Sequence, residues 1–345
     1  MRHARLRGAT ALVSLIGGTI VATSVVAAAA TPLPAHVYAP YFETWTGDSI
    51  SGIAQQSGAR YLTLAFLETT GKSSCTLGWN GSKTQTVAAG TYLQDITALR
   101  TGVGGGDVIP SFGGWSADQG GTEIGDSCKT VASIAAAYEQ VVTTYDVTRL
   151  DMDIEGRSLT KPDGIDRRNK AIKMLQTWAA GNGRTVQIQY TLPTSRDGLE
   201  ASGLAVLQNA VDNGVRVDVV NPMVFDYYDR VKADMGDSAI SALNGLHAQL
   251  ATLYPSKTSA QLWAMTGATI MNGLDDYPRK TEVTTVEDAT QLRTFAAANG
   301  MSTLSMWAIQ RDNGGCPGST GSNNCSGIVQ TTWEFTNALK AFTGP

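Results

Sequence analysis

Residues 148–156 read Thr-Arg-Leu-Asp-Met-Asp-Ile-Glu-Gly, and the interpretation of the whole chain starts from this stretch. Three apolar residues alternate in it with three acidic ones: Leu150, Met152 and Ile154 against Asp151, Asp153 and Glu155. Side chains of a strand point to opposite faces with a period of two. The stretch therefore predicts a strand, Arg149–Glu155, with one apolar face and one face that carries a row of three carboxyl groups.

Two interpretations of the acidic face compete. An exposed edge strand would solvate it, but that arrangement is typical of antiparallel sheets and not of a central parallel strand. Buried carboxyl groups are costly unless they are paired, and barrel interiors are normally filled by Val, Ile and Leu, so packing does not explain the row. We therefore favour a functional site.

Three carboxyl groups in a row also predict an unusual titration. Like charges this close cannot all ionise, so at least one group should keep its proton well above the ordinary carboxyl pKa. A carboxylic acid that stays protonated near neutrality suits a general acid, and hydrolysis of a glycosidic bond is a reaction that needs one. Glu155, at the carboxyl end of the predicted strand, is the first candidate.

The acidic strand is one of eight short apolar or β-branched runs. The predicted strands are Val37–Phe42, Tyr61–Leu67, Asp107–Phe112, Arg149–Glu155, Thr185–Leu192, Val217–Phe225, Gln261–Ala268 and Thr303–Ile309. The clearest predicted helices are Lys129–Tyr145, Ile165–Ala180, Leu199–Asn213, Ser238–Leu253, Val286–Ala298 and Ile328–Ala341. Such alternation predicts an α/β fold with a parallel sheet. About eight strand–helix units in the roughly 315 residues after the first 30 fit a single-domain (β/α)8 TIM barrel. A doubly wound open sheet is the alternative, but residues 38–45 lack its Gly-rich phosphate turn.

The composition excludes several other classes. The chain has 345 residues, of which 42% are hydrophobic and 16% charged, and 26 basic against 30 acidic residues give a net charge of −4. The apolar fraction is too high for an intrinsically disordered chain. The acidic balance, without a Lys/Arg cluster, argues against a nucleic-acid partner.

The N-terminal 30 residues have the features of a secretory signal peptide. Basic residues precede an apolar run over 11–26, and the alanines at 27–30 offer a cleavage site. A membrane anchor is the alternative, because the run is long enough to span a bilayer. Its small residues and the prolines that follow favour cleavage. We therefore expect a secreted chain, with residues 31–345 as one catalytic domain that does not contact a membrane.

Four cysteines in an exported chain indicate two disulfides. Cys316 and Cys325 enclose a Gly/Ser/Asn loop and are paired for that reason, which leaves Cys75 to pair with Cys128. A metal site would need closely spaced cysteines or histidine partners, and neither is present in the expected mature chain. We expect no metal and no cofactor.

The acidic strand also resembles the Asp-x-Asp-x-Glu signature of glycoside hydrolase family 18, the chitinases and their relatives. The resemblance runs from about Val37 to Asp312 and is strongest to bacterial chitinases with a short barrel. The other matching segments are Ala39-Pro40-Tyr41, Leu64-Ala65-Phe66, Ser111-Phe112-Gly113-Gly114, Tyr190-Thr191-Leu192-Pro193, Val220-Asn221 with Met223 and Asp226-Tyr227, and Met306-Trp307 through Arg311-Asp312.

This resemblance implies substrate-assisted hydrolysis of β-1,4 links beside N-acetylglucosamine. Glu155 would protonate the leaving oxygen and later activate water, while the substrate's acetamido oxygen attacks the anomeric carbon. Asp153 would orient the acetamido group, and Asp151 would share a proton with Asp153. Asp226 and Tyr227 match the pair that contacts the acetamido group.

The resemblance also assigns a substrate-binding set. Trp307 matches the indole that forms the floor of the sugar subsite beside the scissile bond. The set also includes Tyr41, Ser111, Gly114 and Met223. Ser111 and Gly114 have an architectural interpretation as well, because glycine lets strands approach closely and a hydroxyl can bond to an interior acid.

Some positions depart from the family pattern. Phe225 stands where many members have tyrosine, and the short-barrel group instead has a tyrosine after the aspartate, as at Tyr227. If Tyr227 points outward, the pair that contacts the acetamido group loses its hydroxyl. Loop tryptophans at 45, 79 and 115 are equally consistent with sugar stacking and with ordinary packing.

Residues 271–302 leave no room for the α+β insertion of some relatives, so we expect an open, shallow groove and endo-type cleavage. The favoured function is a monomeric, secreted chitinase acting on chitin or its oligosaccharides. The alternatives are a non-catalytic chitin-binding lectin on the same barrel and an endo-β-N-acetylglucosaminidase of glycoprotein glycans. The presence of Glu155 favours an enzyme, since lectins of the family commonly lack the acid.

Overall fold

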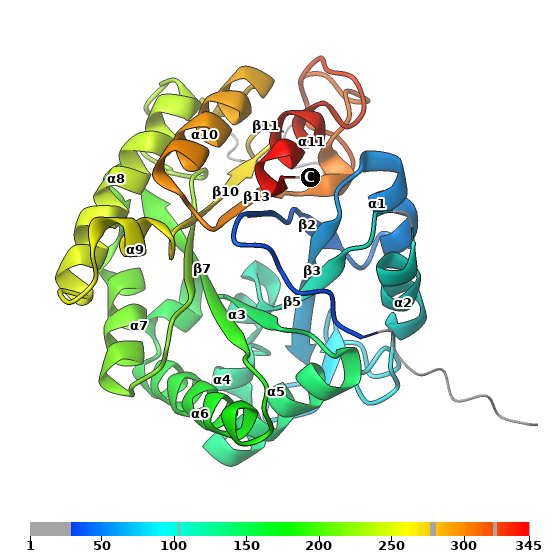
Figure 1. Ribbon diagram of the computed structural model, residues 1–345, viewed down its shortest axis with the longest axis vertical. Coiled ribbons are helices and arrows are strands. Elements are labelled where there is room, and N and C mark those ends of the chain that lie inside the picture. The colour runs from blue at the N-terminus through cyan, green and yellow to red at the C-terminus, as the bar shows by residue number, and fades with distance from the viewer. Residues whose placement is uncertain (1–28, 103, 277–280, 320–322, 345) are drawn as a thin grey trace, which may run out of the picture.

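Parallel strands curl into a barrel that outer helices surround in the computed structural model of the chain (Figure 1). The structure describes residues 29–344 except 103, 277–280 and 320–322, so nearly all of the predicted signal peptide lies outside the described residues. The strands of the barrel are β1 (Val37–Tyr38), β2 (Tyr41–Glu43), β3 (Tyr61–Thr69), β5 (Asp107–Gly113), β6 (Arg149–Asp153), β7 (Gln187–Ser195), β9 (Val219–Met223), β10 (Gly267–Met271) and β13 (Thr303–Trp307).

The barrel closes through the first predicted strand, which is split into β1 and β2. Hydrogen bonding joins the strands in the order β1-β13-β10-β9-β7-β6-β5-β3-β2, and the two ends of this order are neighbouring segments of the chain. Pro40, between them, has no N–H to donate, but its carbonyl accepts the Thr63 N–H at 2.9 Å. The Ala39 N–H donates to the Leu304 carbonyl, also at 2.9 Å. The predicted TIM-barrel fold is confirmed.

Helices cover the outside of the barrel, where they bury the outward-facing side chains of the strands. They are α1 (Ile50–Ser57), α2 (Leu93–Thr101), α5 (Val131–Tyr145), α6 (Pro162–Gly181), α7 (Ala201–Asp212), α8 (Met235–Leu253), α10 (Val286–Asn299) and α11 (Glu334–Leu339), with the shorter α3 (Trp115–Gly120), α4 (Ile124–Ser127) and α9 (Ser259–Trp263). The remaining elements are β4 (Leu77–Trp79), β8 (Gly198–Leu199), β11 (Gly273–Leu274), β12 (Val283–Thr284) and the 3-10 turns η1 (Gly156–Thr160), η2 (Ile309–Arg311) and η3 (Lys340–Thr343).

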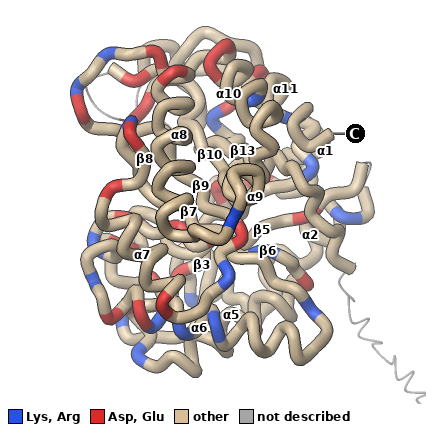
Figure 2. The backbone as a smooth tube through the Cα atoms, turned by 60° about the vertical axis from the view of Figure 1, so that its left-hand side comes forward, with Lys and Arg blue, Asp and Glu red and all other residues tan. Residues whose placement is uncertain are grey.

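Charged residues of both signs are scattered over the outer helices and loops (Figure 2). Within the part of the chain that the structure describes, no helix is both long enough and apolar enough to cross a bilayer.

The alternation in the acidic strand places its two faces as predicted. Leu150, Met152 and Ile154 belong to the hydrophobic core between sheet and helices. The acidic side chains face the barrel interior, where Asp151 is fully buried. However, β6 ends at Asp153 and not at Glu155. The Ile154 N–H still reaches the Thr191 carbonyl of β7 at 3.0 Å, but the Glu155 N–H turns away from the sheet to the Asp118 carboxylate.

Two further predicted elements differ most from their predicted bounds. The predicted strand Gln261–Ala268 begins inside α9, because Thr258 and Gln261 form a reciprocal capping box that starts a helix; the strand, β10, begins only at Gly267. The predicted helix Ile328–Ala341 is an α-helix only over Glu334–Leu339, since Trp333 adopts a left-handed backbone (φ 64°) just before it.

Both predicted disulfides, Cys75–Cys128 and Cys316–Cys325, are present. The first joins the loop before β4 to the end of α4. Between β10 and β13 the described residues form the small β11–β12 hairpin and α10, in agreement with the prediction that no α+β insertion is present.

Candidate active site

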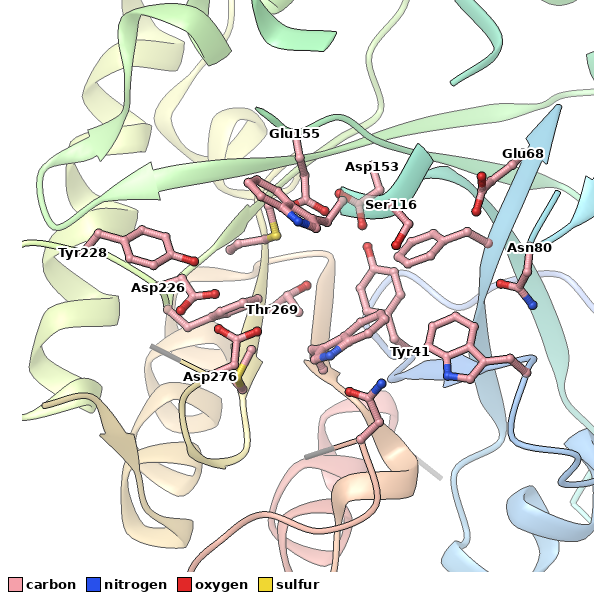
Figure 3. Close-up of a pocket in the computed structure, with 18 residues that line it drawn as sticks. Tyr41, Glu68, Asn80, Ser116, Asp153, Glu155, Asp226, Tyr228, Thr269 and Asp276 are labelled. Atoms are coloured by element: carbon pink, nitrogen blue, oxygen red, sulfur yellow. The ribbon is translucent and has the colours of Figure 1, made fainter. Parts of the chain in front are cut away.

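A cavity of about 780 Å³ opens beyond the carboxyl ends of the barrel strands (Figure 3). Aromatic residues form one side of its lining, and acidic residues lie around it, with Glu68 on the same side as Tyr41 (Figure 3). The aromatic residues include Tyr41, Trp45, Phe66 and Trp307, and the acidic ones are Glu68, Asp153, Glu155, Asp226 and Asp276. Active sites of TIM-barrel enzymes lie at this end of the fold.

Asp151 forms the base of the carboxyl row, below the cavity. Its Oδ2 accepts hydrogen bonds from the hydroxyls of Tyr41 at 2.9 Å and Ser111 at 2.6 Å, and its Oδ1 accepts one from Thr191 at 2.7 Å. Burial raises the pKa of Asp151, while these donors oppose the rise. Asp151 is therefore held rigidly, with its lone pairs already used by the protein.

Asp153 lies between Asp151 and Glu155 and has a different environment. It is buried, and its Oδ1 has no hydrogen-bond partner among the described residues. Burial raises the pKa of Asp153 well above its ordinary value, and the charges of Glu155, Asp151 and Asp118 add to the rise. A carboxyl group without a protein partner at the edge of a cavity is available to a ligand.

Glu155 is half-buried and points into the cavity from the end of the row. Its N–H donates to Asp118, and its carboxylate accepts a hydrogen bond from the Trp115 main chain at the start of α3. Burial raises the pKa of Glu155 to about 7, partly offset by the Trp115 hydrogen bond. Below that pH the group holds a proton that it can donate, as a general acid must.

Glycines bring the neighbouring strand against this row. A Cβ at Gly113 would lie 2.1 Å from the carbonyl oxygen of Asp153, and one at Gly114 would lie 2.6 Å from the Phe66 ring. Both residues have positive φ, 99° and 80°. Gly114 also donates its N–H to the Asp153 carbonyl at 3.0 Å. Ser111 and Gly114, which were assigned to the substrate-binding set, thus contact protein groups beside the cavity and do not line it.

The aromatic side is built around Trp307. Its ring lies nearly parallel to that of Phe66, with centroids 5.5 Å apart and an angle of 11° between the planes. Tyr41 and Trp45 flank it at 5.6 and 6.1 Å. A flat apolar surface beside a carboxyl row suits the apolar face of a sugar ring. Trp115, 60% exposed, also lines the cavity, whereas Trp79 is fully buried and donates to the Tyr145 hydroxyl.

The structure separates Tyr227 from the cavity. Its ring packs beneath the Arg196 guanidinium, 4.4 Å from the ring centroid, and its hydroxyl is buried without a partner among the described residues. Tyr228 lines the cavity instead and points in beside Asp226 (Figure 3). Burial raises the pKa of Asp226 to about 11, and Asp275 and Asp276 add to the rise, so Asp226 carries a proton. Met223 also lines the cavity.

Residues 37–324 match the model of the family described as glycosyl hydrolases family 18. The chain belongs to this family. It is 33% identical over 299 residues to the "Probable bifunctional chitinase/lysozyme" of Escherichia coli K12, covering 83% of this chain and 32% of that protein. It is also 33% identical over 289 residues to "Endochitinase 11" of Metarhizium anisopliae, covering 81% of this chain and 53% of that one. The chain thus spans about a third to a half of the curated relatives that it matches.

Among solved structures, the chain is similar to active domain 2 of the chitinase from Pyrococcus furiosus, with a TM-score of 0.78 and 29% identity over 90% of this chain and 96% of that one. The same domain is known as a catalytic-site mutant complexed with chito-oligosaccharides, at 28% identity and the same TM-score.

Four acids of this family 18 site were not found from the sequence, and Glu68 is one of them. Asp118 contacts Glu155 from α3, and Asp275 and Asp276 contact Asp226 from the segment after β11. No periodic pattern marks Asp118, Asp275 and Asp276, because the first lies on a short helix and the other two follow the two-residue strand β11. Glu68, on β3, accepts a hydrogen bond from Thr122 and lines the far end of the cavity.

Carboxylate oxygens of Asp226, Asp275 and Asp276 lie within 4.8 Å of one another, a spacing that a metal ion could use. The Asp226 N–H donates to Asp275 at 2.9 Å, and the positive charge of Arg311 acts on both Asp275 and Asp276. The Arg311 guanidinium is thus a nearby positive charge for this acidic group.

Proposed function

We propose that the protein hydrolyses β-1,4 linkages beside N-acetylglucosamine in chitin or its oligosaccharides. The observation that carries the proposal is the row of Asp151, Asp153 and Glu155, which ends in a protonated acid at an aromatic-lined cavity. The names of the relatives, chitinases and an endochitinase, support the same substrate class.

In the proposed reaction Glu155 donates its proton to the leaving glycosidic oxygen as the bond to the anomeric carbon breaks. The substrate's acetamido oxygen forms the new bond to that carbon, which gives an oxazolinium ion and explains why the row supplies no separate nucleophile. Glu155, now ionised, removes a proton from the water that attacks the same carbon. The bond from that carbon to the acetamido oxygen breaks, which restores the acetamido group and gives net retention of configuration.

Asp153 positions the acetamido group in this scheme. Its Oδ1 has no protein partner and is available to the acetamido N–H, which turns the acetamido oxygen toward the anomeric carbon. Asp151, held by three hydroxyl groups, cannot turn toward the substrate and instead balances the charge and proton of Asp153.

The remaining groups of the cavity bind the sugar. Trp307 stacks on the ring beside the scissile bond, and Tyr228 with protonated Asp226 forms the polar wall opposite Glu155. We further propose an open groove with endo-type cleavage, and secretion of the chain after removal of residues 1–30.

The test is hydrolysis of N-acetylglucosamine tetramer to hexamer by the wild type and Glu155→Gln, with the anomeric form of the products followed by NMR. We expect retained-anomer products from the wild type and a loss of at least about 10²-fold in rate in Glu155→Gln. Glu287→Gln, at an exposed glutamate on α10, is the matched control and should keep full activity.

Binding without turnover by the wild type would contradict the proposal and favour a lectin. A wild type that neither binds nor hydrolyses these oligosaccharides would also contradict the proposal, and glycoprotein glycans would then be the substrates to test. Full activity of Glu155→Gln would show that another group is the acid.

A further inference from the structure

A fourth carboxyl group lies against the catalytic row, on the helix that follows β5. Asp118 is fully buried, and its Oδ2 accepts the main-chain N–H of Glu155. Its Oδ1 has no partner among the described residues. The proposed mechanism gives this group no role.

The contact forms where the chain leaves the sheet. Ile154 still donates its N–H to β7, but the next N–H, that of Glu155, has no strand neighbour to accept it. A buried N–H without an acceptor is costly, so some group has to be supplied at this point. Asp118 is that group, and it comes from an element 37 positions earlier in the chain.

Helix α3 holds the end of the row at three points. The Gly114 N–H donates to the Asp153 carbonyl at 3.0 Å, the Trp115 main chain donates to the Glu155 carboxylate, and Asp118 accepts the Glu155 N–H. The Asp118 N–H in turn donates to the Gly114 carbonyl at 3.1 Å, which ties the three contacts into one turn. The carboxylate and the main chain of Glu155 are therefore both set by α3.

Burying a carboxyl group at this position is unfavourable in free energy. The side chain lies in the interior near Glu123 and Glu155, and burial together with these charges raises the pKa of Asp118 well above its ordinary value. The rise in pKa favours the neutral form of Asp118, which accepts the Glu155 N–H without placing a further negative charge beside the catalytic row.

We propose that Asp118 is a positioning residue for Glu155: by accepting its N–H, Asp118 sets the direction from which the Glu155 carboxyl group reaches the scissile bond. The proposal rests on the proposed hydrolase function. Its consequence is that the geometry of the acid depends on α3 as much as on β6, which ends two residues before Glu155.

The experiment compares Asp118→Asn, Asp118→Ala and Asp107→Asn with the wild type on N-acetylglucosamine hexamer. Asp118→Asn keeps an oxygen acceptor and should stay within about threefold of the wild-type kcat. Asp118→Ala removes the acceptor and should lower kcat by about tenfold to a hundredfold, with KM changed less than about threefold, because misplacement of a catalytic group by about 1 Å has effects of this size. Asp107→Asn, at a buried acid paired with Arg100 on the opposite end of β5, should lower the unfolding temperature without changing kcat of the folded enzyme.

Two results would overturn the inference. One is an unchanged kcat in Asp118→Ala, and the other is an equal loss in Asp118→Asn and Asp118→Ala. If Asp118→Ala does not fold, Asp118→Ser, whose shorter side chain does not reach the Glu155 N–H, takes its place with the same expected loss.

Amide hydrogen exchange over residues 153–156 separates this inference from the proposed function. We expect faster exchange there in Asp118→Ala than in Asp118→Asn, whether or not the wild type hydrolyses chitin oligosaccharides. Absence of wild-type turnover would therefore reject the function alone, whereas equal exchange in the two variants would reject the role of Asp118.

Discussion

At the scale of single residues, Tyr227 and Tyr228 are adjacent in the chain and lie on different sides of the cavity wall. Positive φ angles at Asp226 (51°) and Tyr228 (53°) turn the backbone between them, so the alternation of a strand does not apply after β9. The ring of Tyr227 packs under Arg196 outside the cavity, and that of Tyr228 faces Asp226 inside it. The tyrosine hydroxyl beside Asp226 in the cavity is therefore that of Tyr228 and not that of Tyr227.

We predict that Tyr228→Phe lowers kcat on N-acetylglucosamine hexamer by about tenfold or more, since it removes a donor from the polar wall opposite Glu155. Tyr227→Phe is the matched control and should change kcat less than about twofold, because its buried hydroxyl makes no hydrogen bond that would be lost. Steady-state kinetics of the two variants shows which of the two hydroxyl groups contributes to kcat. A larger loss in Tyr227→Phe would mean that the segment after β9 rearranges when substrate binds.

At the scale of elements, the connections after the strands hold the site together, and one of the two disulfides ties such connections. Cys75–Cys128 joins residues 53 positions apart, from the loop before β4 to the end of α4, the short helix that follows α3. Cys316–Cys325 closes a separation of only 9 positions after β13. The loop entropy that a crosslink removes from the unfolded chain grows with the length of the loop that it closes.

We predict that replacing Cys75 and Cys128 by serine costs about 4 kcal/mol in the free energy of unfolding, against about 2.5 kcal/mol for the Cys316/Cys325 pair. Urea denaturation of the two double variants, each compared with the oxidised wild type, measures the difference. A greater loss from the short loop would show that native contacts of that loop, and not chain entropy, dominate its contribution.

At the scale of the whole molecule, the fold buries several carboxyl groups with raised pKa values at one end of the barrel. Glu43, at the end of β2, is fully buried, and neither of its carboxylate oxygens has a hydrogen-bond partner among the described residues. Burial raises the pKa of Glu43 to about 8, although the nearby charge of Arg311 opposes this. Burial likewise raises the pKa of Glu282 and of Glu155 to about 7 and that of Asp226 to about 11.

The raised pKa values of these groups predict that the folded state becomes less stable as the pH rises. Between about pH 5 and pH 7 each is ionised in the unfolded chain and largely protonated in the folded one, and Glu43 stays so to about pH 8. Folding therefore takes up protons in this window, and a higher pH favours unfolding. We expect the unfolding temperature to be higher at pH 5.5 than at pH 8. Glu43→Gln should flatten this dependence by about 1–3 kcal/mol in the free energy of unfolding, since the amide cannot ionise.

Thermal unfolding of the wild type, Glu43→Gln and the surface control Glu287→Gln at both pH values tests the prediction. An identical pH dependence in all three proteins would mean that Glu43 is already ionised in the folded state.

The sequence by itself determined the barrel, the row of acids and the two disulfides of this protein. A period of two places Asp151, Asp153 and Glu155 on one face, and the repetition of strand and helix signals fixes the parallel sheet, because both depend on local geometry. The tertiary structure alone decided that Asp118 contacts Glu155, that Tyr228 and not Tyr227 lines the cavity, and that Asp275 and Asp276 contact Asp226. These contacts form between connections far apart in the chain or depend on residues with positive φ, where no periodic rule relates sequence position to side-chain direction.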